Sequence, residues 1–329
     1  MKIGVFCSGG DAPGMNPCVR AIVRTALSAG HQVVGINRGY DGLLKEDFFL
    51  DQSNSSLMNL RTVSGWSRHG GAFLRSSRSA EFRTVEGMQK AAKILQQHEI
   101  DALIPIGGDG TFRGAVEFSQ YWPGQMVGCP GTIDNDLCGT DYTIGFSTAV
   151  NTAVEAVDKL RDTAESHDRM FLIEVMGRDS GFIAMMTALA CGAEIAAIPE
   201  TKTDFPKIVE YLHELKRRGK TSVMMIVSEG DEEGGAEILN EQIKKLGCPF
   251  STRVVILGHL QRGGAPTPED RIRATQMGTA AVQAILRGEN MVMIGMRGTD
   301  CVSVPFEETY RAHHEISPKW ISLLEIMAS

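Results

Sequence analysis

The residues Met126-Val-Gly-Cys-Pro-Gly-Thr-Ile-Asp-Asn-Asp136 join a short apolar run to a loop that holds a glycine and two carboxylates. Apolar runs of this length are typical of buried strands, and the loop begins where the strand is expected to end. Asp134 and Asp136 can simply cap turns. Two carboxylates this close can also divide the work of a general base and a metal ligand. The stretch therefore predicts a strand that delivers acidic side chains to a site.

Two further loops also follow apolar runs directly. Ser8-Gly-Gly-Asp-Ala-Pro-Gly-Met-Asn16 follows the run Lys2 to Cys7, and Gly107-Gly-Asp-Gly-Thr111 follows Ala102 to Ile106. Glycines let backbone N–H groups approach an anion closely, and a helix that starts after the loop adds a favourable dipole. Each loop alone has a structural alternative, because strand-to-helix turns need glycine anyway.

Apolar runs alternate with segments of helical period along the chain. Asn16 is expected to cap a helix whose first position is Pro17. The other expected strands are 33–36, 171–175, 223–227 and 254–257, and the other expected helices are 84–98, 147–164, 206–218, 236–246 and 268–287. This alternation predicts an α/β architecture with mainly parallel sheets, in which ligands bind at the carboxyl ends of strands.

Length and composition fit a protein of about two domains. The 329 residues are 43% apolar and 22% charged, with a net charge of −7. Arg outnumbers Lys by 21 to 12, and Arg is the better bidentate ligand for phosphates. An acidic protein of this kind is a poor nucleic-acid binder and a good candidate for small anionic ligands.

Several classes of protein are excluded on sequence grounds. No apolar stretch reaches the roughly 18 residues of a membrane span. The first residues enter a strand-like run at once, which leaves no room for a signal peptide. The 7 cysteines are spread out and form no Cys-x-x-Cys pair, so we expect neither a zinc site nor a disulfide framework. A cytoplasmic location is the expectation.

The standard nucleotide fingerprints are absent. Gly108-Asp-Gly110 finds its third glycine, Gly114, one residue late for the dinucleotide pattern, and Gly219-Lys-Thr221 has Glu214 where a Walker loop begins with glycine. These departures argue against a hydride-transfer enzyme and against a P-loop ATPase. The Gly107–Thr111 pattern on its own also occurs in nicotinamide-nucleotide kinases and lipid kinases.

With the loop at 130–136, the chain resembles the bacterial type of the 6-phosphofructokinase family over nearly its whole length. The matching motifs appear in the family's order: Gly9-Gly-Asp-Ala-Pro-Gly-Met-Asn16, Gly107-Gly-Asp-Gly110, Pro130–Asp136, Glu174-Val-Met-Gly-Arg178, Ser228-Glu229 and Leu257-Gly-His-Leu-Gln-Arg-Gly-Gly264. The resemblance implies two Rossmann-like αβα domains. It places an ATP-binding domain at 1–145 with about 258–310, and a smaller domain for fructose 6-phosphate at 146–257 with about 311–329.

The resemblance also implies phosphoryl transfer from ATP to the 1-hydroxyl of fructose 6-phosphate. Asp134 is the expected general base, with Thr132 and Asp136 in support, and Asp109 is the expected Mg²⁺ ligand. Gly10 offers its N–H to the transferred phosphate, while Arg78 and Arg178 neutralise charge. The residues expected to line the nucleotide are Tyr40, Arg83, Gly108, Gly110, Thr111 and Gly114.

The sugar site and an effector site follow in the same way. The expected sugar ligands are Met176, Gly177, Glu229, His259 and Arg262, with Arg169 and Arg253 on the 6-phosphate from a neighbouring subunit. That sharing implies a homotetramer. From the residues alone, Met176 and His259 read as core side chains, and Arg169 and Arg253 read as surface residues just before apolar strands.

An effector site for ADP, GDP or phosphoenolpyruvate is matched by Arg20, Arg24, Arg161, Glu194, Arg218 and Lys220. A simple salt-bridge cluster is the alternative. The chain departs from the family near 52–71, where it carries about seven extra residues. It also has Arg75 where the family usually has glycine, and no clear counterpart of an effector Arg near 51–53.

Two rival functions remain. Pyrophosphate-dependent relatives have an Asp at the position of Gly110 and a Lys at the position of Gly131. Glycine at both positions in this chain favours ATP. A catalytically silent sugar-phosphate or nucleotide sensor is the other rival, and it is disfavoured by the presence of Asp109, Thr132, Asp134 and Arg178.

Overall fold

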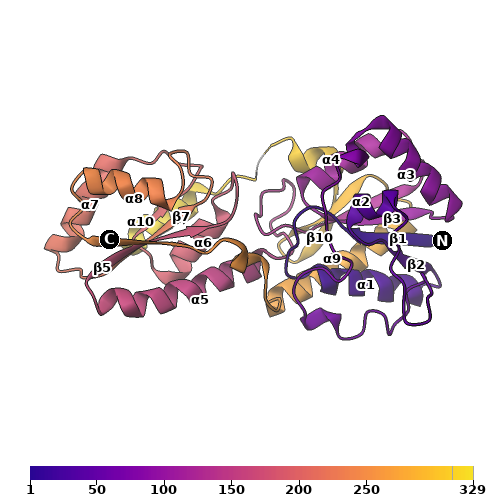
Figure 1. Ribbon diagram of the computed structural model, residues 1–329, viewed down its shortest axis with the longest axis horizontal. Coiled ribbons are helices and arrows are strands. Elements are labelled where there is room, and N and C mark those ends of the chain that lie inside the picture. The colour runs from indigo at the N-terminus through magenta and orange to yellow at the C-terminus, as the bar shows by residue number, and fades with distance from the viewer. Residues whose placement is uncertain (313, 329) are drawn as a thin grey trace. The chain divides into compact units, whose positions relative to one another are not determined.

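The computed structural model describes residues 1–312 and 314–328, which form two compact units (Figure 1). Unit 1 comprises Met1–Ile133, Leu137–Thr148 and Arg262–His314, and unit 2 comprises Asp134–Asp136, Ala149–Gln261 and Glu315–Ser329. The chain therefore crosses between units several times. The domain bounds expected from the sequence place two of these crossings between residues 145 and 146 and between residues 257 and 258. Which substrate each unit binds stays a prediction.

Unit 1 is built on a six-stranded sheet in the order β10-β9-β4-β3-β1-β2. All neighbours pair in parallel except β9 and β10, which form an antiparallel hairpin. The strands are β1 (Lys2–Cys7), β2 (Gln32–Gly35), β3 (Ala102–Gly107), β4 (Gln125–Pro130), β9 (Val292–Arg297) and β10 (Asp300–Pro305). β1, β3 and β4 are adjacent and parallel, so the three glycine loops that follow them lie side by side at the carboxyl ends of these strands.

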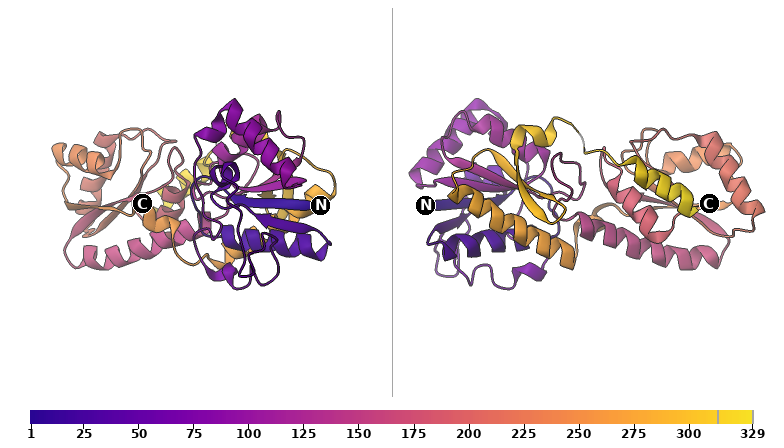
Figure 2. Two further views of the ribbon diagram at one scale, coloured as in Figure 1. Left: turned by 45° about the vertical axis from the view of Figure 1, so that its right-hand side comes forward. Right: turned by 180° about the vertical axis from the view of Figure 1, so that it is seen from behind.

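Helices cover both faces of this sheet (Figure 2). α1 (Met15–Ser28) packs against α9 (Pro268–Leu286) on one face. The other face is covered by α2 (Gly39–Leu44), α3 (Val85–Gln97) and α4 (Asp109–Phe118), with the short 3-10 helices η2 (Glu81–Arg83) and η4 (Phe306–Tyr310). A further 3-10 helix, η1 (Trp66–Arg68), lies beside α1.

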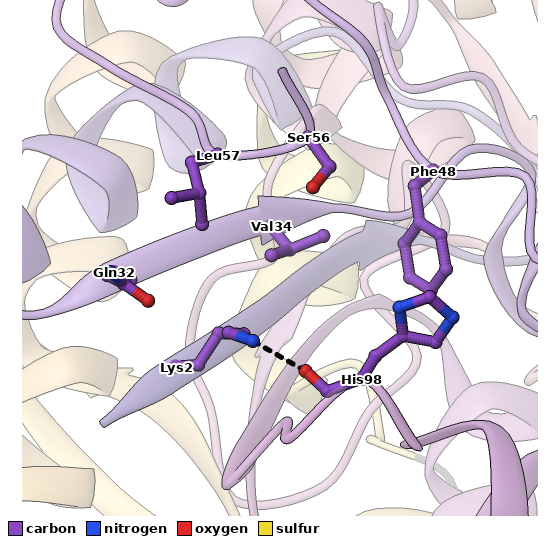
Figure 3. Close-up of a pocket in the computed structure, with 7 residues that line it drawn as sticks. All are labelled: Lys2, Gln32, Val34, Phe48, Ser56, Leu57 and His98. Carbon is purple, nitrogen blue, oxygen red and sulfur yellow. Dashed lines mark hydrogen bonds between the residues drawn. The ribbon is translucent and has the colours of Figure 1, made fainter. Parts of the chain in front are cut away.

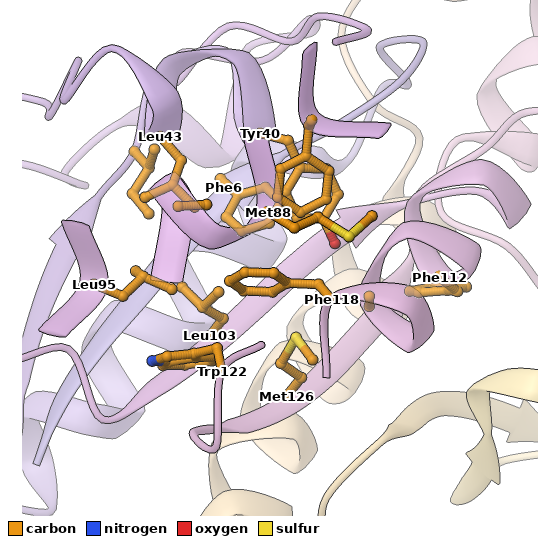
Figure 4. Close-up of a cluster of buried hydrophobic side chains, with 14 of the residues drawn as sticks. Phe6, Tyr40, Leu43, Met88, Leu95, Leu103, Phe112, Phe118, Trp122 and Met126 are labelled. Carbon is orange, nitrogen blue, oxygen red and sulfur yellow. The ribbon is translucent and has the colours of Figure 1, made fainter. Parts of the chain in front are cut away.

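The main core of unit 1 lies between the sheet and α2, α3 and α4 (Figure 4). Phe118 of α4 is fully buried and packs with Phe82 and Trp122, at ring-centroid distances of 5.3 and 5.8 Å. Full burial of a side chain of this size stabilises the fold by about 1.5–3 kcal/mol. This packing fixes α4, and with it Asp109 at the start of α4.

Unit 2 has a four-stranded, fully parallel sheet in the order β6-β7-β5-β8. Its strands are β5 (Arg169–Val175), β6 (Ile195–Ala197), β7 (Val223–Ser228) and β8 (Ser251–Ile256). α7 (Phe205–Arg217) and α8 (Ala236–Lys245) pack on one face over Leu172, Val223 and Leu239. The other face carries α5 (Phe146–Glu165), α6 (Phe182–Cys191) and α10 (Pro318–Ala328), and η3 (Gly258–Arg262) follows β8.

The predicted α/β class with mainly parallel sheets is confirmed, since each unit has a mainly parallel sheet with helices on both faces. Within residues 1–312 and 314–328, no helix combines the length and the apolar character that a membrane crossing needs.

Two local predictions are wrong. Asn16 does not cap a helix that starts at Pro17, because α1 begins at Met15 with Gly14 as its N-cap. The Asn16 amide bonds instead to a loop far away in the sequence. Arg253 does not precede its strand. It is the third residue of β8, because this edge strand begins with the polar pair Ser251-Thr252.

Candidate active site

In unit 1 the three glycine loops are bonded to one another at the carboxyl ends of β1, β3 and β4. The Ser8 N–H donates to the Ile106 carbonyl at 2.9 Å, and the Gly131 N–H donates to the Gly107 carbonyl at 3.0 Å. The Thr111 hydroxyl donates to the Ser8 carbonyl at 3.3 Å. A Cβ at Gly107 would lie 2.6 Å from that carbonyl oxygen, so a glycine is required here. The fold therefore brings these predicted site residues together at the carboxyl ends of the three strands.

Gly110 and Gly131, which bear on the choice of phosphate donor, have different surroundings. A Cβ at Gly110 would meet nothing within 4 Å, so the position faces open space. A Cβ at Gly131 would lie 2.9 Å from side-chain carbons of both Ile106 and Met15. Any side chain at position 131 would therefore force its neighbours to move.

Asp109 presents a carboxylate to solvent at the start of α4. Its side chain is 43% exposed, and the Arg113 Nε lies 3.7 Å from one of its oxygens. A carboxylate next to glycine N–H groups is the kind of donor that Mg²⁺ takes together with phosphate oxygens. The neighbouring Gly108 lies close to Thr132, since its Cβ would be 3.7 Å from the Thr132 Cβ.

Tyr40 and Gly114, predicted to line the nucleotide, lie below the second loop. Tyr40 is buried, stacks on Phe82 at 3.8 Å and donates its hydroxyl to the Thr111 carbonyl at 3.1 Å. Burial raises the pKa of Tyr40 above its ordinary value. A Cβ at Gly114 would make ordinary contact with both rings, at 3.5 Å. From this position Tyr40 supports the loop through the Thr111 carbonyl.

The segment that carries Arg75 and Arg78 is tied to the first loop. The Gly9 N–H donates to the Ser77 carbonyl at 3.2 Å, and the Ser76 hydroxyl donates to the Gly9 carbonyl at 2.5 Å. Arg75 has a φ of 58°, a left-handed conformation that favours glycine. Arg78 and Arg83 are both exposed, Arg83 at the end of η2.

Arg262 lies on the first loop. Its Nη1 donates to the Asp11 carbonyl at 3.1 Å, and a Cβ at Gly10 would be only 2.2 Å from that nitrogen. A side chain at position 10 would therefore push the guanidinium away. Within unit 1, the Arg262 side chain therefore lies in direct contact with the predicted phosphate loop.

The loop after β4 passes from unit 1 to unit 2 between Ile133 and Asp134. In unit 2 the Asp134 side chain is 3% exposed, and one of its oxygens lies 3.7 Å from the Arg178 Nε. The Ser180 hydroxyl donates to the Asp134 carbonyl at 2.9 Å. Two predicted catalytic residues, Asp134 and Arg178, are thus brought together as a pair.

The predicted sugar ligands of unit 2 lie at the carboxyl ends of β5, β7 and β8. The Arg178 N–H donates to the Glu229 carboxylate at 3.0 Å. The Met176 N–H donates to the Gln261 side chain at 3.3 Å. A Cβ at Gly177, whose φ is 142°, would lie 2.3 Å from the Ser180 carbonyl oxygen. His259 lies in η3 and is exposed, which argues against a core histidine.

Arg169 and Arg253 are separated from these ligands. Arg169 is the first residue of β5, about 20 Å from the end of that strand, since a strand rises about 3.3 Å per residue. Arg253 pairs with Phe171 on the neighbouring strand. These two arginines cannot reach the Met176–Arg178 turn of their own unit.

Three of the predicted effector residues form an ion-pair cluster in unit 2. Glu194 is 5% exposed, and its carboxylate lies 2.5 Å from the Lys220 Nζ and 4.0 Å from the Arg161 Nη1. Arg218 pairs with Glu214 on the surface of α7. Arg20 and Arg24 lie on α1 in unit 1. The structure therefore places Arg161, Glu194 and Lys220 together, while Arg218 pairs with Glu214.

Ser180, which was not predicted from the sequence, contacts the predicted site residues. It is buried, its N–H donates to the Gly177 carbonyl at 3.0 Å, and its hydroxyl reaches Asp134 as described above. Its carbonyl accepts from the Ser228 hydroxyl at 3.4 Å. Its position two residues after Arg178 was the available signal.

A pocket of about 260 Å³ lies away from these residues (Figure 3). Lys2 and Gln32, which line it, are the first residues of β1 and β2. It therefore lies at the amino ends of the strands, opposite to the edge where ligands bind in such sheets. The Lys2 ammonium group is already bonded to the His98 carbonyl at 2.7 Å.

Comparisons with known proteins point to one family. The family described as Phosphofructokinase matches residues 2–285. The chain is 47% identical over 327 residues to ATP-dependent 6-phosphofructokinase 1 of Thermus thermophilus, with 99% of each chain covered. It is 45% identical over 325 residues to ATP-dependent 6-phosphofructokinase 2 of Bacteroides thetaiotaomicron, with 98% and 97% covered.

Solved structures agree. The phosphofructokinase of Pichia pastoris in the T-state is 32% identical with a TM-score of 0.87. The match covers 99% of this chain and 39% of that longer one. A pyrophosphate-dependent phosphofructokinase from Marinobacter aquaeolei shares the fold, with a TM-score of 0.84 at 22% identity. On both the sequence and the structural evidence, this chain belongs to the phosphofructokinase family.

Proposed function

We infer that this chain is an ATP-dependent 6-phosphofructokinase, a glycolytic kinase. It transfers the γ-phosphoryl group of ATP to the 1-hydroxyl of fructose 6-phosphate, giving fructose 1,6-bisphosphate and ADP. The observation that carries this inference is the 47% identity, over 99% of both chains, with a relative named for this activity. The site described above has the parts that phosphoryl transfer needs, which are phosphate-binding loops, cationic side chains and a buried carboxylate.

Asp134 acts as the general base. Its carboxylate takes the proton of the 1-hydroxyl while that oxygen bonds to the γ-phosphorus, and the bond between the γ-phosphorus and the bridging oxygen of ADP breaks. The carboxylate is nearly buried, and the Arg178 guanidinium beside it stabilises charge during transfer. Thr132 and Asp136 flank it in sequence and support it.

The donor is held by the interlocked loops of unit 1. The Gly10 N–H and Arg78 bind the transferred phosphate, and Asp109 is the carboxylate that would hold Mg²⁺. That ion would neutralise charge on the phosphate oxygens. The remaining nucleotide contacts are assigned to Arg83, Gly108, Gly110, Thr111 and Gly114, with Tyr40 below them.

The sugar is held by Met176, Gly177, Arg178, Glu229, His259 and Arg262. Arg169 and Arg253 lie too far along their strands to join them. Their assignment to the 6-phosphate therefore requires a second subunit, which supports the proposed homotetramer. A cytoplasmic location is part of the same proposal.

We expect ATP to be strongly preferred over pyrophosphate as the donor. Gly110 leaves open space where a nucleotide donor needs it, and Gly131 is too closely packed to give way to a lysine. Initial rates with fructose 6-phosphate and each donor at equal concentration test this preference. Faster turnover with pyrophosphate than with ATP would contradict it, and no turnover with either donor would favour the silent sensor.

ADP, GDP or phosphoenolpyruvate is the proposed effector, bound at Arg20, Arg24, Arg161, Arg218 and Lys220. The burial of Glu194 between Lys220 and Arg161 gives the ion-pair cluster a structural role as well. We expect ADP or phosphoenolpyruvate to shift the saturation curve for fructose 6-phosphate. Curves that stay superimposed with either compound would rule out a working effector site.

A further inference from the structure

Asn16 is a fully buried polar side chain in the first turn of α1. Its amide Nδ2 donates to the carbonyls of His69 and Gly70, at 2.9 and 3.1 Å. Its Oδ1 accepts from the Phe73 N–H at 2.8 Å. One side chain thus uses both of its donors and its acceptor oxygen on a loop more than 50 residues away.

The loop held in this way is compact. The Trp66 and Phe73 rings stack at 4.9 Å with an interplanar angle of 21°. The stacked pair brackets the residues that Asn16 binds. Such rings contribute about 0.5–1.5 kcal/mol beyond the area they bury. The stack therefore ties the two ends of residues 66–73 together, and Asn16 holds this segment against α1.

The loop lies against the turn that follows Arg262. A Cβ at Gly70 would be 2.0 Å from the Gly264 carbonyl oxygen and 3.3 Å from the Gly264 nitrogen. Backbone therefore meets backbone without room for a side chain. Arg262, two residues before Gly264, bonds to the Asp11 carbonyl and covers Gly10.

The same loop leads directly into the segment that carries Arg78. The Leu74 carbonyl accepts from the Arg38 N–H at 2.8 Å. Ser76 and Ser77 then bond to Gly9 from both sides, as described above. Residues 69–78 are thus in contact with the phosphate loop at one end and with the Arg262 turn at the other.

We propose that Asn16 is a positioning residue for phosphoryl transfer. By fixing residues 69–73 it sets the Arg262 guanidinium and the segment that carries Arg78 against the Gly9–Asp11 loop. This inference rests on the proposed function, because Arg262 and Arg78 are assigned there to the sugar and the transferred phosphate. Helix capping does not explain the amide, since Gly14 is the N-cap and the partners of Asn16 lie outside α1.

Two variants and a control test the proposal. Asn16→Ala removes all three hydrogen bonds. Gly70→Ala leaves the Asn16 amide in place and forces the loop away from the Gly264 backbone, because the added Cβ would lie 2.0 Å from the Gly264 carbonyl oxygen. Gly71→Asn is the control, because its φ of 65° suits asparagine and its Cβ would meet nothing within 4 Å.

Both variants are expected to raise the KM for fructose 6-phosphate roughly tenfold and to lower kcat roughly tenfold, since displacements of about 1 Å can cost up to 10²-fold. A smaller folded fraction would lower the maximal rate and leave KM unchanged, so the KM change separates positioning from stability. Gly71→Asn is expected to match the wild type in both constants.

Trypsin cleavage after Arg68 gives a readout that does not depend on activity, because Arg68 is exposed within the loop. Asn16→Ala is expected to be cut there faster than the wild type. Unchanged cleavage, or faster cleavage with wild-type KM and kcat, would overturn the proposal. If Asn16→Ala fails to fold, an unchanged KM in Gly70→Ala overturns it.

An inactive wild type would overturn the proposed function and, with it, the catalytic meaning of this loop. An active wild type with unaffected variants would overturn only the role of Asn16.

Discussion

Asp134→Asn is expected to fold like the wild type and to lose a factor of at least about 10² in kcat, because general-base catalysis contributes about 10²–10⁴. An amide has nearly the same shape as a carboxylate and cannot accept the proton of the 1-hydroxyl. The bond from the Ser180 hydroxyl goes to the Asp134 backbone, so the substitution leaves it in place. The loss should therefore appear in turnover and not in folding.

Asp179→Asn is the matched control for this variant. Asp179 follows Arg178 directly, and its side chain is exposed. Removal of this charge leaves the proposed base in place, so kcat should stay close to the wild-type value, and stability should change by no more than about 0.5 kcal/mol. Wild-type turnover in Asp134→Asn would refute its role as the base.

Asp270→Ala is expected to cost about 4 kcal/mol of stability, because each buried donor that loses its acceptor costs about 1–3 kcal/mol. Asp270 is fully buried at the start of α9. One oxygen accepts from the Tyr142 hydroxyl and the Gly145 N–H, both at 2.6 Å. The other accepts from the Thr148 N–H at 2.8 Å and from the Thr148 hydroxyl. The carboxylate thus joins α9 to the chain that leads into α5.

Burial raises the pKa of Asp270, while the hydrogen bonds from Thr148, Tyr142 and Gly145 act in the opposite direction. Burial of the ionised carboxylate therefore costs free energy in the wild type, and this cost is absent in Asp270→Ala. The orphaned donors outweigh this gain. The thermal midpoint of unfolding should fall by roughly 10 °C, because a destabilisation of 1 kcal/mol lowers it by about 2–4 °C in a folded unit the size of unit 1.

The neighbouring Glu269→Ala is the control for Asp270→Ala. Glu269 is exposed and forms an ion pair with Arg273 at 3.8 Å. Exposed pairs of this kind contribute about 0–1 kcal/mol. Equal thermal midpoints for Asp270→Ala and Glu269→Ala would show that the buried carboxylate does not hold α9 to the chain at 142–148.

Local patterns were sufficient to predict the three glycine loops and most strands and helices. Thr84 illustrates this: it caps α3 by accepting from the Gly87 N–H at 3.0 Å, a signal that lies within four residues. Strand order is a different matter. That β1 lies between β2 and β3 depends on contacts between segments far apart in the sequence, and no local pattern carries that information.

The errors have the same physical origin. Asn16 looks like a helix cap because its partners, His69, Gly70 and Phe73, lie in an irregular segment more than 50 residues away. Arg253 looks like a residue before a strand because β8 lies at an edge, where polar residues can begin a strand without being buried.

One missed element did have a local signal. Val292–Arg297 and Asp300–Pro305 are joined by two residues, and Gly298 has a φ of 59°. Two-residue turns with glycine in this conformation are the preferred connection of antiparallel hairpins. The β9–β10 hairpin was therefore within reach of the sequence.

The proposed reaction can be followed by the fate of the γ-phosphoryl group. Wild-type protein would be incubated with fructose 6-phosphate, Mg²⁺ and ATP labelled in the γ-phosphate, and the labelled products separated. We predict that the label appears at carbon 1 of fructose 1,6-bisphosphate, with one ADP formed for each labelled sugar. Label found only in inorganic phosphate, or remaining in ATP while the sugar is unchanged, would contradict the assignment of this chain as an ATP-dependent 6-phosphofructokinase.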